Sequence, residues 1–171
     1  IDTKISQEEQ QFIFSLQFSK VQEKEEQLGG EEQKAKAGES QKPAINLDDA
    51  NVLLVEDNLI NQKIVLLSLK KVVKNVDVAN NGKEALDKFG SVKYDMILMD
   101  IQMPIMNGIV TTKKIRNIEK STNTHTPIIA ITANALLGDK EECLAAGTDD
   151  YISKPFQIET LMNKMKALLE Q

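Results

Sequence analysis

The most informative stretch of the sequence is VLLVED at residues 52–57, in which an apolar run ends in two carboxylates, Glu56 and Asp57. The run has the length and composition of a strand that is buried on both faces, as in a parallel sheet covered by helices. Polar residues directly after such a strand lie at the carboxyl edge of the sheet, where open α/β sheets place their sites. The stretch therefore predicts a parallel sheet with an acidic site at its edge.

Three further apolar runs are followed by side chains that can carry chemistry. Asp100 follows MILM at 96–99, Thr132 follows IIAI at 128–131, and Lys154 follows YIS at 151–153 directly before a proline. Segments of helix length separate the runs, so we expect alternating strands and helices, a parallel sheet and right-handed crossovers. Three acids, one hydroxyl and one amine are then expected to converge on one edge.

This set of side chains suits a divalent cation and a transferable phosphoryl group. Mg²⁺ is usually held by one or two carboxylates together with phosphate oxygens, a role open to Glu56 and Asp57. Asp100 can act as both ligand and nucleophile, because an aspartate can form an aspartyl-phosphate. Thr132 can donate to one phosphoryl oxygen and Lys154 can contact another. Each residue alone is common as a helix cap or a solvated loop residue, but their ordered recurrence favours a site.

Four stretches carry a resemblance to a known family: VLLVEDN (52–58), MILMDIQMPIMNG (96–108), PIIAITANAL (127–136) and YISKPF (151–156). With them, residues 51–170 resemble the receiver domain of two-component response regulators. The resemblance implies an α/β fold, a flavodoxin-like (βα)₅ three-layer sandwich with a five-stranded parallel sheet. It also implies Mg²⁺-dependent transfer of a phosphoryl group from a phosphohistidine within a phosphorelay, which switches the contacts with partners.

The resemblance also assigns roles to residues. Asp100 corresponds to the phosphoacceptor, Glu56 and Asp57 to the Mg²⁺ residues, and Thr132 and Lys154 to the pair that contacts the phosphate. The backbone carbonyl of Gln102 corresponds to a further metal ligand. Tyr151 corresponds to the switch aromatic, coupled to Thr132, and the Lys154–Pro155 peptide bond is expected to be cis.

The local patterns give the bounds of the expected elements. We expect a short second strand at 76–79 and a helix that ends before Gly147, a residue suited to a left-handed cap. The expected helices cover residues 58–72, 82–90, 108–119, 135–146 and 156–169.

The helix at 58–72 has more apolar residues than one buried stripe requires. We expect Ile60, Ile64 and Leu67 to face the core. A second row contains Leu59, Leu66 and Leu69. This row is either part of a wide buried stripe or an exposed docking surface. In the family, this helix packs on the helices of a histidine-kinase dimerisation domain or a histidine phosphotransfer protein.

Composition narrows the class of protein. The chain has 171 residues with 21 basic and 26 acidic side chains, a net charge of −5 and no basic stripe, which argues against nucleic-acid binding. The single cysteine, Cys143, excludes an intrachain disulfide and favours a reducing cytoplasm. No apolar stretch is long enough to cross a bilayer, so we expect a cytoplasmic domain without direct membrane contact, whose parent protein could still be tethered to a membrane.

The first part of the chain differs in kind from the rest. Residues 11–18, QFIFSLQF, alternate apolar and polar residues as a strand does, and resemble the last strand of a histidine-kinase ATPase domain. An orphan amphipathic tail is the alternative. Residues 19–48 have the Gln, Glu and Lys content of a linker. We therefore expect a domain remnant at 1–18, a linker at 19–48 and a receiver domain at 49–171, cut from a hybrid histidine kinase.

Two alternatives to the phosphoacceptor function stay open. A Mg²⁺-dependent phosphatase with an aspartate nucleophile needs a second acid two residues after Asp100, where the chain has Gln102. A receiver-like module that binds partners without phosphorylation usually lacks one of the acids or the lysine, and all are present. The chain has no kinase catalytic core, and a receiver catalyses only its own phosphorylation and dephosphorylation.

Overall fold

The computed structural model describes residues 45–133 and 137–170. Its strands are β1 (Asn51–Val55), β2 (Asn75–Ala79), β3 (Met96–Asp100), β4 (Ile128–Thr132) and β5 (Asp150–Ser153). Its helices are α2 (Leu59–Leu69), α3 (Gly82–Phe89), α4 (Gly108–Thr122), α5 (Leu137–Ala146) and α6 (Ile158–Leu169), preceded by a short 3₁₀ helix, η1 (Leu47–Asp49).

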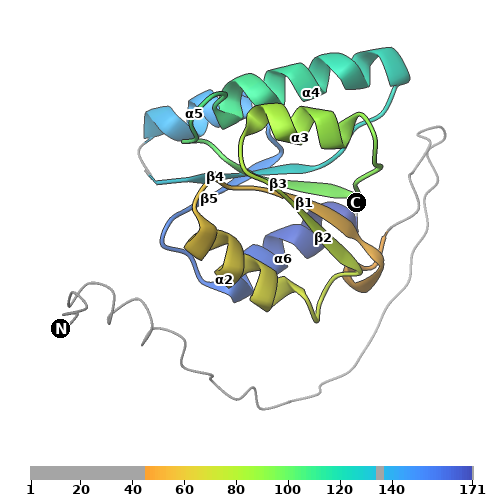
Figure 1. Cartoon of the computed structure of the whole chain (residues 1–171), viewed down its shortest axis with the longest axis vertical. Helices are drawn as coiled ribbons and strands as arrows, with labels where there is room; N and C mark the ends of the chain where they lie inside the picture. Colours follow the sequence, from red (N-terminus) through yellow and green to blue (C-terminus); the bar gives the residue numbers. More distant parts are fainter. Residues whose placement is uncertain (1–44, 134–136, 171) are drawn as a thin grey trace, which may run out of the picture. The chain divides into compact units, whose positions relative to one another are not determined.

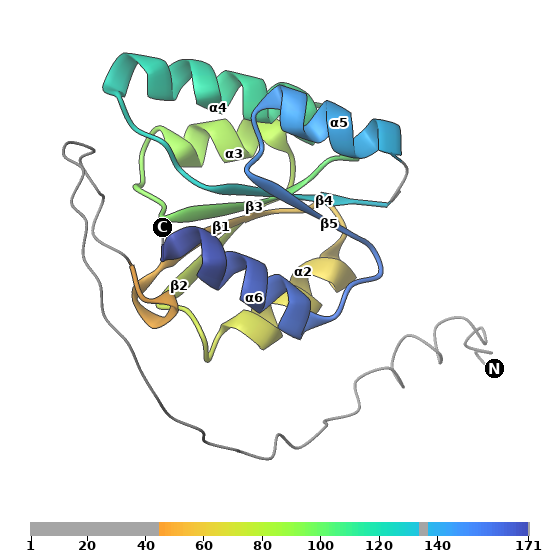
Figure 2. The ribbon, with the colours of Figure 1, turned by 180° about the vertical axis from the view of Figure 1, so that it is seen from behind.

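The strands form one parallel sheet in the order β2-β1-β3-β4-β5. Helices α2 and α6 cover one face, and α3, α4 and α5 cover the other (Figures 1 and 2). This is the predicted flavodoxin-like arrangement. From β1 the chain adds β2 on one side and β3 on the other, so the strand order reverses at β1 and leaves a crevice at the carboxyl ends of β1 and β3.

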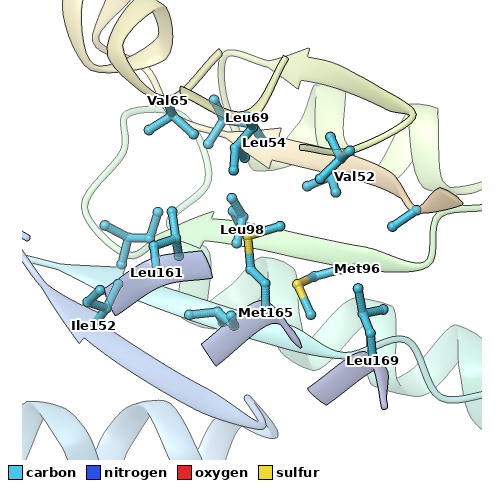
Figure 3. Close-up of a cluster of buried hydrophobic side chains, with 14 residues drawn as sticks. Val52, Leu54, Val65, Leu69, Met96, Leu98, Ile152, Leu161, Met165 and Leu169 are labelled. Carbon is cyan, nitrogen blue, oxygen red and sulfur yellow. The ribbon is translucent and has the colours of Figure 1, made fainter. Parts of the chain in front are cut away.

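The central strands β1, β3 and β4 are buried on both faces because helices cover both sides of the sheet. Figure 3 shows the cluster beneath α2 and α6, where Leu54 and Leu98 of the sheet meet Leu161 and Met165 of α6. On the other face, Leu53, Ile97 and Ile115 belong to a second buried cluster. Each fully buried aliphatic side chain of this kind stabilises a fold by about 1.5–3 kcal/mol. The continuous apolar runs of the sequence thus follow from burial on both faces.

The strands and helices predicted for the receiver-like part of the chain are present among the described residues, with ends that differ by a few residues. Helix α2 begins at Leu59 because Asn58 caps it, the Asn58 Oδ1 accepting hydrogen bonds from two backbone amides of the first turn. Helix α4 runs three residues beyond the expected end at 119, to Thr122. Asn123 caps it in a left-handed conformation with φ of 51°. Gly147 has φ of 103°, as a left-handed cap requires.

The predicted buried row of α2 is wrong. Ile60 and Leu67 are 66% and 75% exposed, whereas Val65 and Leu69 are buried. The buried stripe also contains a polar residue, Gln62, whose side-chain amide donates to the Glu56 backbone oxygen at 2.6 Å. The Asn58 cap and the buried Gln62 amide therefore determine which side of α2 faces the core, and apolar side chains remain on the exposed side.

The beginning of the described chain is attached to the domain. The Ile45 backbone amide donates to the Leu169 oxygen at 3.1 Å, and Ile45 and Leu47 pack against the cluster beneath α6. These residues belong to the segment assigned to the linker, so contacts with the domain begin before residue 49. The predicted strand at 11–18 and the linker up to residue 44 lie outside the described residues. Within the described ranges, no helix has the length and apolar character of a membrane-spanning segment.

Candidate functional site

Three carboxylates meet at the carboxyl edge of the sheet. Glu56 and Asp57 follow β1, and Asp100 is the last residue of the neighbouring strand β3. Each offers an oxygen, and these oxygens lie within 4.8 Å of one another. Glu56 and Asp100 are buried, whereas Asp57 is exposed. The predicted convergence of the acids is therefore present, in a cluster that opens toward solvent on the side of Asp57.

Lys154 lies between two of these acids. Its Nζ is 2.7 Å from Glu56 Oε2 and 2.7 Å from Asp100 Oδ2. The backbone amide of Lys154 donates to the Thr132 oxygen at 2.7 Å, so the end of β4 positions the lysine. The Lys154–Pro155 peptide bond is cis, as the resemblance implied.

Burial and charge shift the pKa values in this cluster. Burial raises the pKa of Asp100 above its ordinary value, and the negative charge of Glu56 adds to this, while the hydrogen bond from Lys154 opposes it. Burial alone would lower the pKa of Lys154, but its hydrogen bonds to Asp100 and Glu56 outweigh that effect and raise it. Lys154 is therefore charged at neutral pH, and one ammonium faces three acids, a balance that an added cation would improve.

The loop after β3 fixes the orientation of Asp100. The Gln102 backbone amide donates to Asp100 Oδ1 at 3.0 Å, so both carboxylate oxygens have a donor, this amide and Lys154. Gly108 lets the loop return close to the strand, because a Cβ there would lie 2.2 Å from the Asp100 backbone oxygen. The Gly108 amide also donates to the Ile101 oxygen at 3.0 Å. A residue larger than glycine at position 108 would therefore displace Asp100.

Thr132 and Tyr151 lie on neighbouring strands. Thr132 is buried at the end of β4, and Tyr151 pairs with Ala130, two residues earlier on that strand. Paired residues of parallel strands, and residues two apart on one strand, point to the same face, so the two side chains share one face of the sheet. The Tyr151 ring also faces two cations, Lys140 Nζ at 5.1 Å and Lys164 Nζ at 5.7 Å from its centroid.

Sequence reasoning missed two polar residues that contact this site. The Asn61 Nδ2 donates to Glu56 Oε1 at 3.1 Å, and the neighbouring Gln62 holds the Glu56 backbone oxygen. The available signal was their position in the first turns of the helix that follows Glu56 and Asp57. Polar residues there can reach back to the end of the preceding strand.

Exposed apolar side chains lie on α2 and in the loop after β3. On α2, Leu59, Ile60 and Leu67 are 65%, 66% and 75% exposed. We call these three residues the α2 patch. Beyond Asp100, Ile105 is 81% exposed and has φ of 70°, a conformation that branched residues rarely adopt. The second row predicted for this helix is divided: Leu59 is exposed, Leu66 is half-buried against the cluster beneath α2 and α6, and Leu69 is buried.

The comparisons with known proteins agree with this geometry. The protein-family model for the response regulator receiver domain matches residues 52–166 of the chain. Hybrid signal transduction histidine kinase I of Dictyostelium discoideum is 50% identical over 109 residues, which are 61% of this chain and 6% of that protein. The chain therefore spans a small part of this relative.

Two solved structures have similar folds. The receiver domain of sensor histidine kinase PA1611 from Pseudomonas aeruginosa PAO1, with a magnesium ion coordinated in its active site cleft, gives a TM-score of 0.65 at 37% identity, over 72% of this chain and 99% of that one. The receiver domain of the Saccharomyces cerevisiae response regulator Ssk1, crystallised with the histidine phosphotransfer signaling protein Ypd1, gives a TM-score of 0.66 at 34% identity, over 72% and 90%. Sequence, fold and the family match over 52–166 lead to one conclusion: the chain belongs to the response regulator receiver domains of two-component systems.

Proposed function

We propose that Asp100 of this receiver domain accepts a phosphoryl group from a phosphohistidine, in a Mg²⁺-dependent step of a phosphorelay. The proposal rests on the charged groups that surround the Asp100 carboxylate. Acidic oxygens of Glu56 and Asp57 lie within 4.8 Å of it, and the Lys154 ammonium contacts it at 2.7 Å. Phosphoryl transfer depends mainly on positioning and on neutralising charge. The arrangement positions the Asp100 carboxylate, and Lys154 together with a bound cation would neutralise the charge.

A Mg²⁺ ion fits the donor set. Receiver domains bind Mg²⁺ in their active site, and the cluster here is built of the carboxylate oxygens that this ion prefers. Asp57, Asp100 and the Gln102 backbone carbonyl would hold the ion, with Glu56 beside it. When bound, it neutralises the charge between the acids and the incoming phosphoryl group. Together with Lys154 it brings three positive charges to three carboxylates, so the assembled site is close to neutral.

The roles of the residues follow from their positions. An oxygen of Asp100 attacks phosphorus, the bond from phosphorus to the donor imidazole nitrogen breaks, and that nitrogen keeps the electron pair. Lys154 already contacts Asp100 and exchanges this contact for one with a phosphoryl oxygen. The Thr132 hydroxyl donates to another phosphoryl oxygen. Moving Thr132 leaves space that Tyr151 can fill, because both side chains share one face of the sheet.

The partner that this site requires carries a phosphohistidine on a helix. The α2 patch begins at Leu59, two residues after Asp57, and continues along the exposed side of the helix to Leu67, which suits docking of such helices. The complex between Ypd1 and the Ssk1 receiver domain supports a histidine phosphotransfer protein as one class of partner, and the kinase relative supports a histidine-kinase dimerisation domain as another. We accordingly propose a cytoplasmic hybrid histidine kinase as the parent protein.

The test is phosphorylation by a small donor. The protein is incubated with Mg²⁺ and acetyl phosphate, and the intact mass is followed. We expect one phosphoryl group in the wild type, none in Asp100→Asn, and slower addition in Asp57→Asn, which loses a metal ligand. Asp87→Asn on the exposed surface of α3 is the matched control and should behave as the wild type. Phosphorylation of Asp100→Asn at the wild-type level would refute the assignment.

Membership in the receiver family weighs against the two alternatives. The side chain two residues after Asp100 is the amide of Gln102, which cannot serve as the general acid of an aspartate-dependent phosphatase. A module that is never phosphorylated would have no use for Lys154 between Glu56 and Asp100.

A further inference from the structure

We propose that Asn61 is a positioning residue that holds the Glu56 carboxylate and thereby sets the affinity and selectivity of the site for Mg²⁺. The inference rests on the proposed function, because it takes the acidic cluster to be a metal site. It concerns a residue outside the cluster of acids, which contacts one of them from the first turns of α2.

Each oxygen of the Glu56 carboxylate is held by donors. Oε1 accepts from the Asn58 backbone amide at 3.2 Å and from Asn61 Nδ2 at 3.1 Å, and Oε2 accepts from Lys154 Nζ at 2.7 Å. A carboxylate has about four acceptor positions, so one remains for a metal-bound water. Glu56 is 2% exposed, and bulk water therefore cannot replace a donor that is lost.

Asn61 and Lys154 differ in what happens to them during the reaction. Lys154 is shared between Glu56 and Asp100, and it must turn toward the phosphoryl group when Asp100 is modified. Its hold on Glu56 then weakens. Asn61 contacts Glu56 on the other oxygen and takes no part in the transfer. Among the described residues, Asn61 is therefore the side chain that keeps Glu56 oriented both before and after the step.

The start of α2 makes this contact rigid. Asn58 caps the helix and accepts from the Asn61 backbone amide at 3.2 Å. The next residue, Gln62, is buried and donates to the Glu56 backbone oxygen at 2.6 Å and to Asn80 Oδ1 at 2.9 Å. Asn80 in turn donates its side-chain amide to Glu84 Oε2 at 2.8 Å in the first turn of α3. Adjacent residues of α2 thus fix the side chain and the backbone of Glu56.

A fixed Glu56 favours Mg²⁺ over Ca²⁺. Mg²⁺ requires near-octahedral geometry at short distances, whereas Ca²⁺ takes six to eight oxygens in a flexible arrangement. Without the Asn61 amide, the Glu56 carboxylate can turn about its side-chain bonds and become an additional ligand. This additional ligand would offset the loss of affinity for Ca²⁺ but not the loss of affinity for Mg²⁺. The expected signature is a change in the ratio of the two affinities, which a loss of stability alone would not produce.

The experiment compares Asn61→Leu with Lys63→Leu by isothermal titration calorimetry with Mg²⁺ and with Ca²⁺. Leucine matches asparagine in shape and has no donor. Lys63 is exposed on the same helix, and its side chain makes no hydrogen bond or ion pair with the described residues, so its variant is the matched control. We expect Asn61→Leu to bind Mg²⁺ roughly tenfold more weakly, as for other residues that orient metal ligands, with a smaller loss for Ca²⁺. Lys63→Leu should match the wild type for both ions.

The outcomes separate this inference from the proposed function. Wild-type affinity and wild-type ion selectivity in Asn61→Leu would overturn the inference alone. Equal weakening of both ions, with a lower melting temperature without metal, would show a merely structural role and would also overturn it. A wild type that binds no Mg²⁺ would overturn the proposed function and this inference together. If Asn61→Leu does not fold, Asn61→Ala gives the same measurement with the residue of highest helix propensity.

Discussion

The Lys154 ammonium lies 2.7 Å from Asp100 Oδ2, although the two residues are 54 positions apart in the chain. In the unphosphorylated protein this contact partly compensates a buried acid that has further acids as neighbours. The compensation is incomplete, because burial and Glu56 still raise the pKa of Asp100. The proposed acceptor is thus a carboxylate whose ionised form costs stability as long as no cation or phosphoryl group neutralises the charge around it.

Replacing Asp100 with asparagine should raise the melting temperature at neutral pH in the absence of Mg²⁺. The folded pKa of Asp100 is raised, so its contribution to stability is fully present below the ordinary carboxyl pKa and is lost as the pH rises through the folded value. Asp100→Asn removes this loss, and the gain in melting temperature over the wild type should grow with pH across that window. Mg²⁺ should raise the melting temperature of the wild type and narrow the gap. A gap that is constant with pH would contradict the prediction.

Replacing Gly108 with alanine should disturb the acceptor. The added Cβ would lie 2.2 Å from the Asp100 backbone oxygen, so the loop must shift, at a cost of about 1–3 kcal/mol in the free energy of unfolding. Gly90→Ala is the matched control, since the nearest atom to its Cβ is at 3.5 Å and its φ is −71°. Only Gly108→Ala should unfold at a lower denaturant concentration and be labelled more slowly by acetyl phosphate. Equal behaviour of the two variants would show that the close approach is unimportant.

Adding charge to the α2 patch should weaken phosphotransfer from a protein donor. Ile60→Glu places a carboxylate in the surface proposed to meet the donor helices, and the side chain is exposed, so the stability of the domain should change by no more than about 0.5 kcal/mol. Transfer from a phosphorylated histidine phosphotransfer protein should slow at least about tenfold, equivalent to 1.4 kcal/mol. Labelling by acetyl phosphate should be unchanged.

The control for this surface is Val92→Glu, which alters an exposed apolar residue between α3 and β3. Its transfer rate should equal that of the wild type. If Ile60→Glu also accepts the phosphoryl group at the wild-type rate, the donor does not dock on the α2 patch.

Replacing Thr132 with alanine should uncouple Tyr151 from the acceptor. Phosphorylation adds roughly −1.5 to −2 charge, and the Thr132 hydroxyl is the group expected to turn toward it. A modification shifts a conformational equilibrium only through its different interaction with the two states, so the shift should need Thr132. Amide chemical shifts around Tyr151 should change on addition of Mg²⁺ and beryllofluoride in the wild type and in the exposed control Thr160→Ala. A full change in Thr132→Ala would disprove the coupling.

The strands and the acidic cluster were predictable because each depends on a short-range pattern. Strands buried on both faces need continuous apolar runs, and in a parallel sheet the residue after each run must lie at the shared edge. The positions of Glu56, Asp57, Asp100 and Lys154 follow from that rule alone. The family resemblance added the expected roles.

The buried face of α2 could not be predicted from the spacing of its apolar residues. Ile60 and Leu67 have the spacing of a core row, yet the buried amide of Gln62 and the Asn58 cap set the rotation that exposes them. Asn61 was missed for a related reason, because its contact with Glu56 depends on that rotation.

Arg116 illustrates contacts that only the folded chain reveals. From the sequence alone, a charged residue in a helix is expected to be exposed to solvent. The Arg116 guanidinium instead donates to the Gly147 oxygen at 2.8 Å and to Asp149 Oδ2 at 2.7 Å. Neither partner is near it in sequence. These contacts join α4 to the segment that leads into β5, at the amino edge of the sheet.

A sheet whose strands all run in one direction has a practical consequence for the design of reporters. The acids and Lys154 lie at the carboxyl edge, so the segments that lead into the strands carry none of this chemistry. Of these, the segment before β5 is tied to Arg116, whereas residues 91–93 before β3 are exposed. A fluorescent group or an inserted tag at Val92 would therefore lie at the far end of the sheet from Asp100, where it can report on the protein without obstructing the proposed phosphohistidine donor.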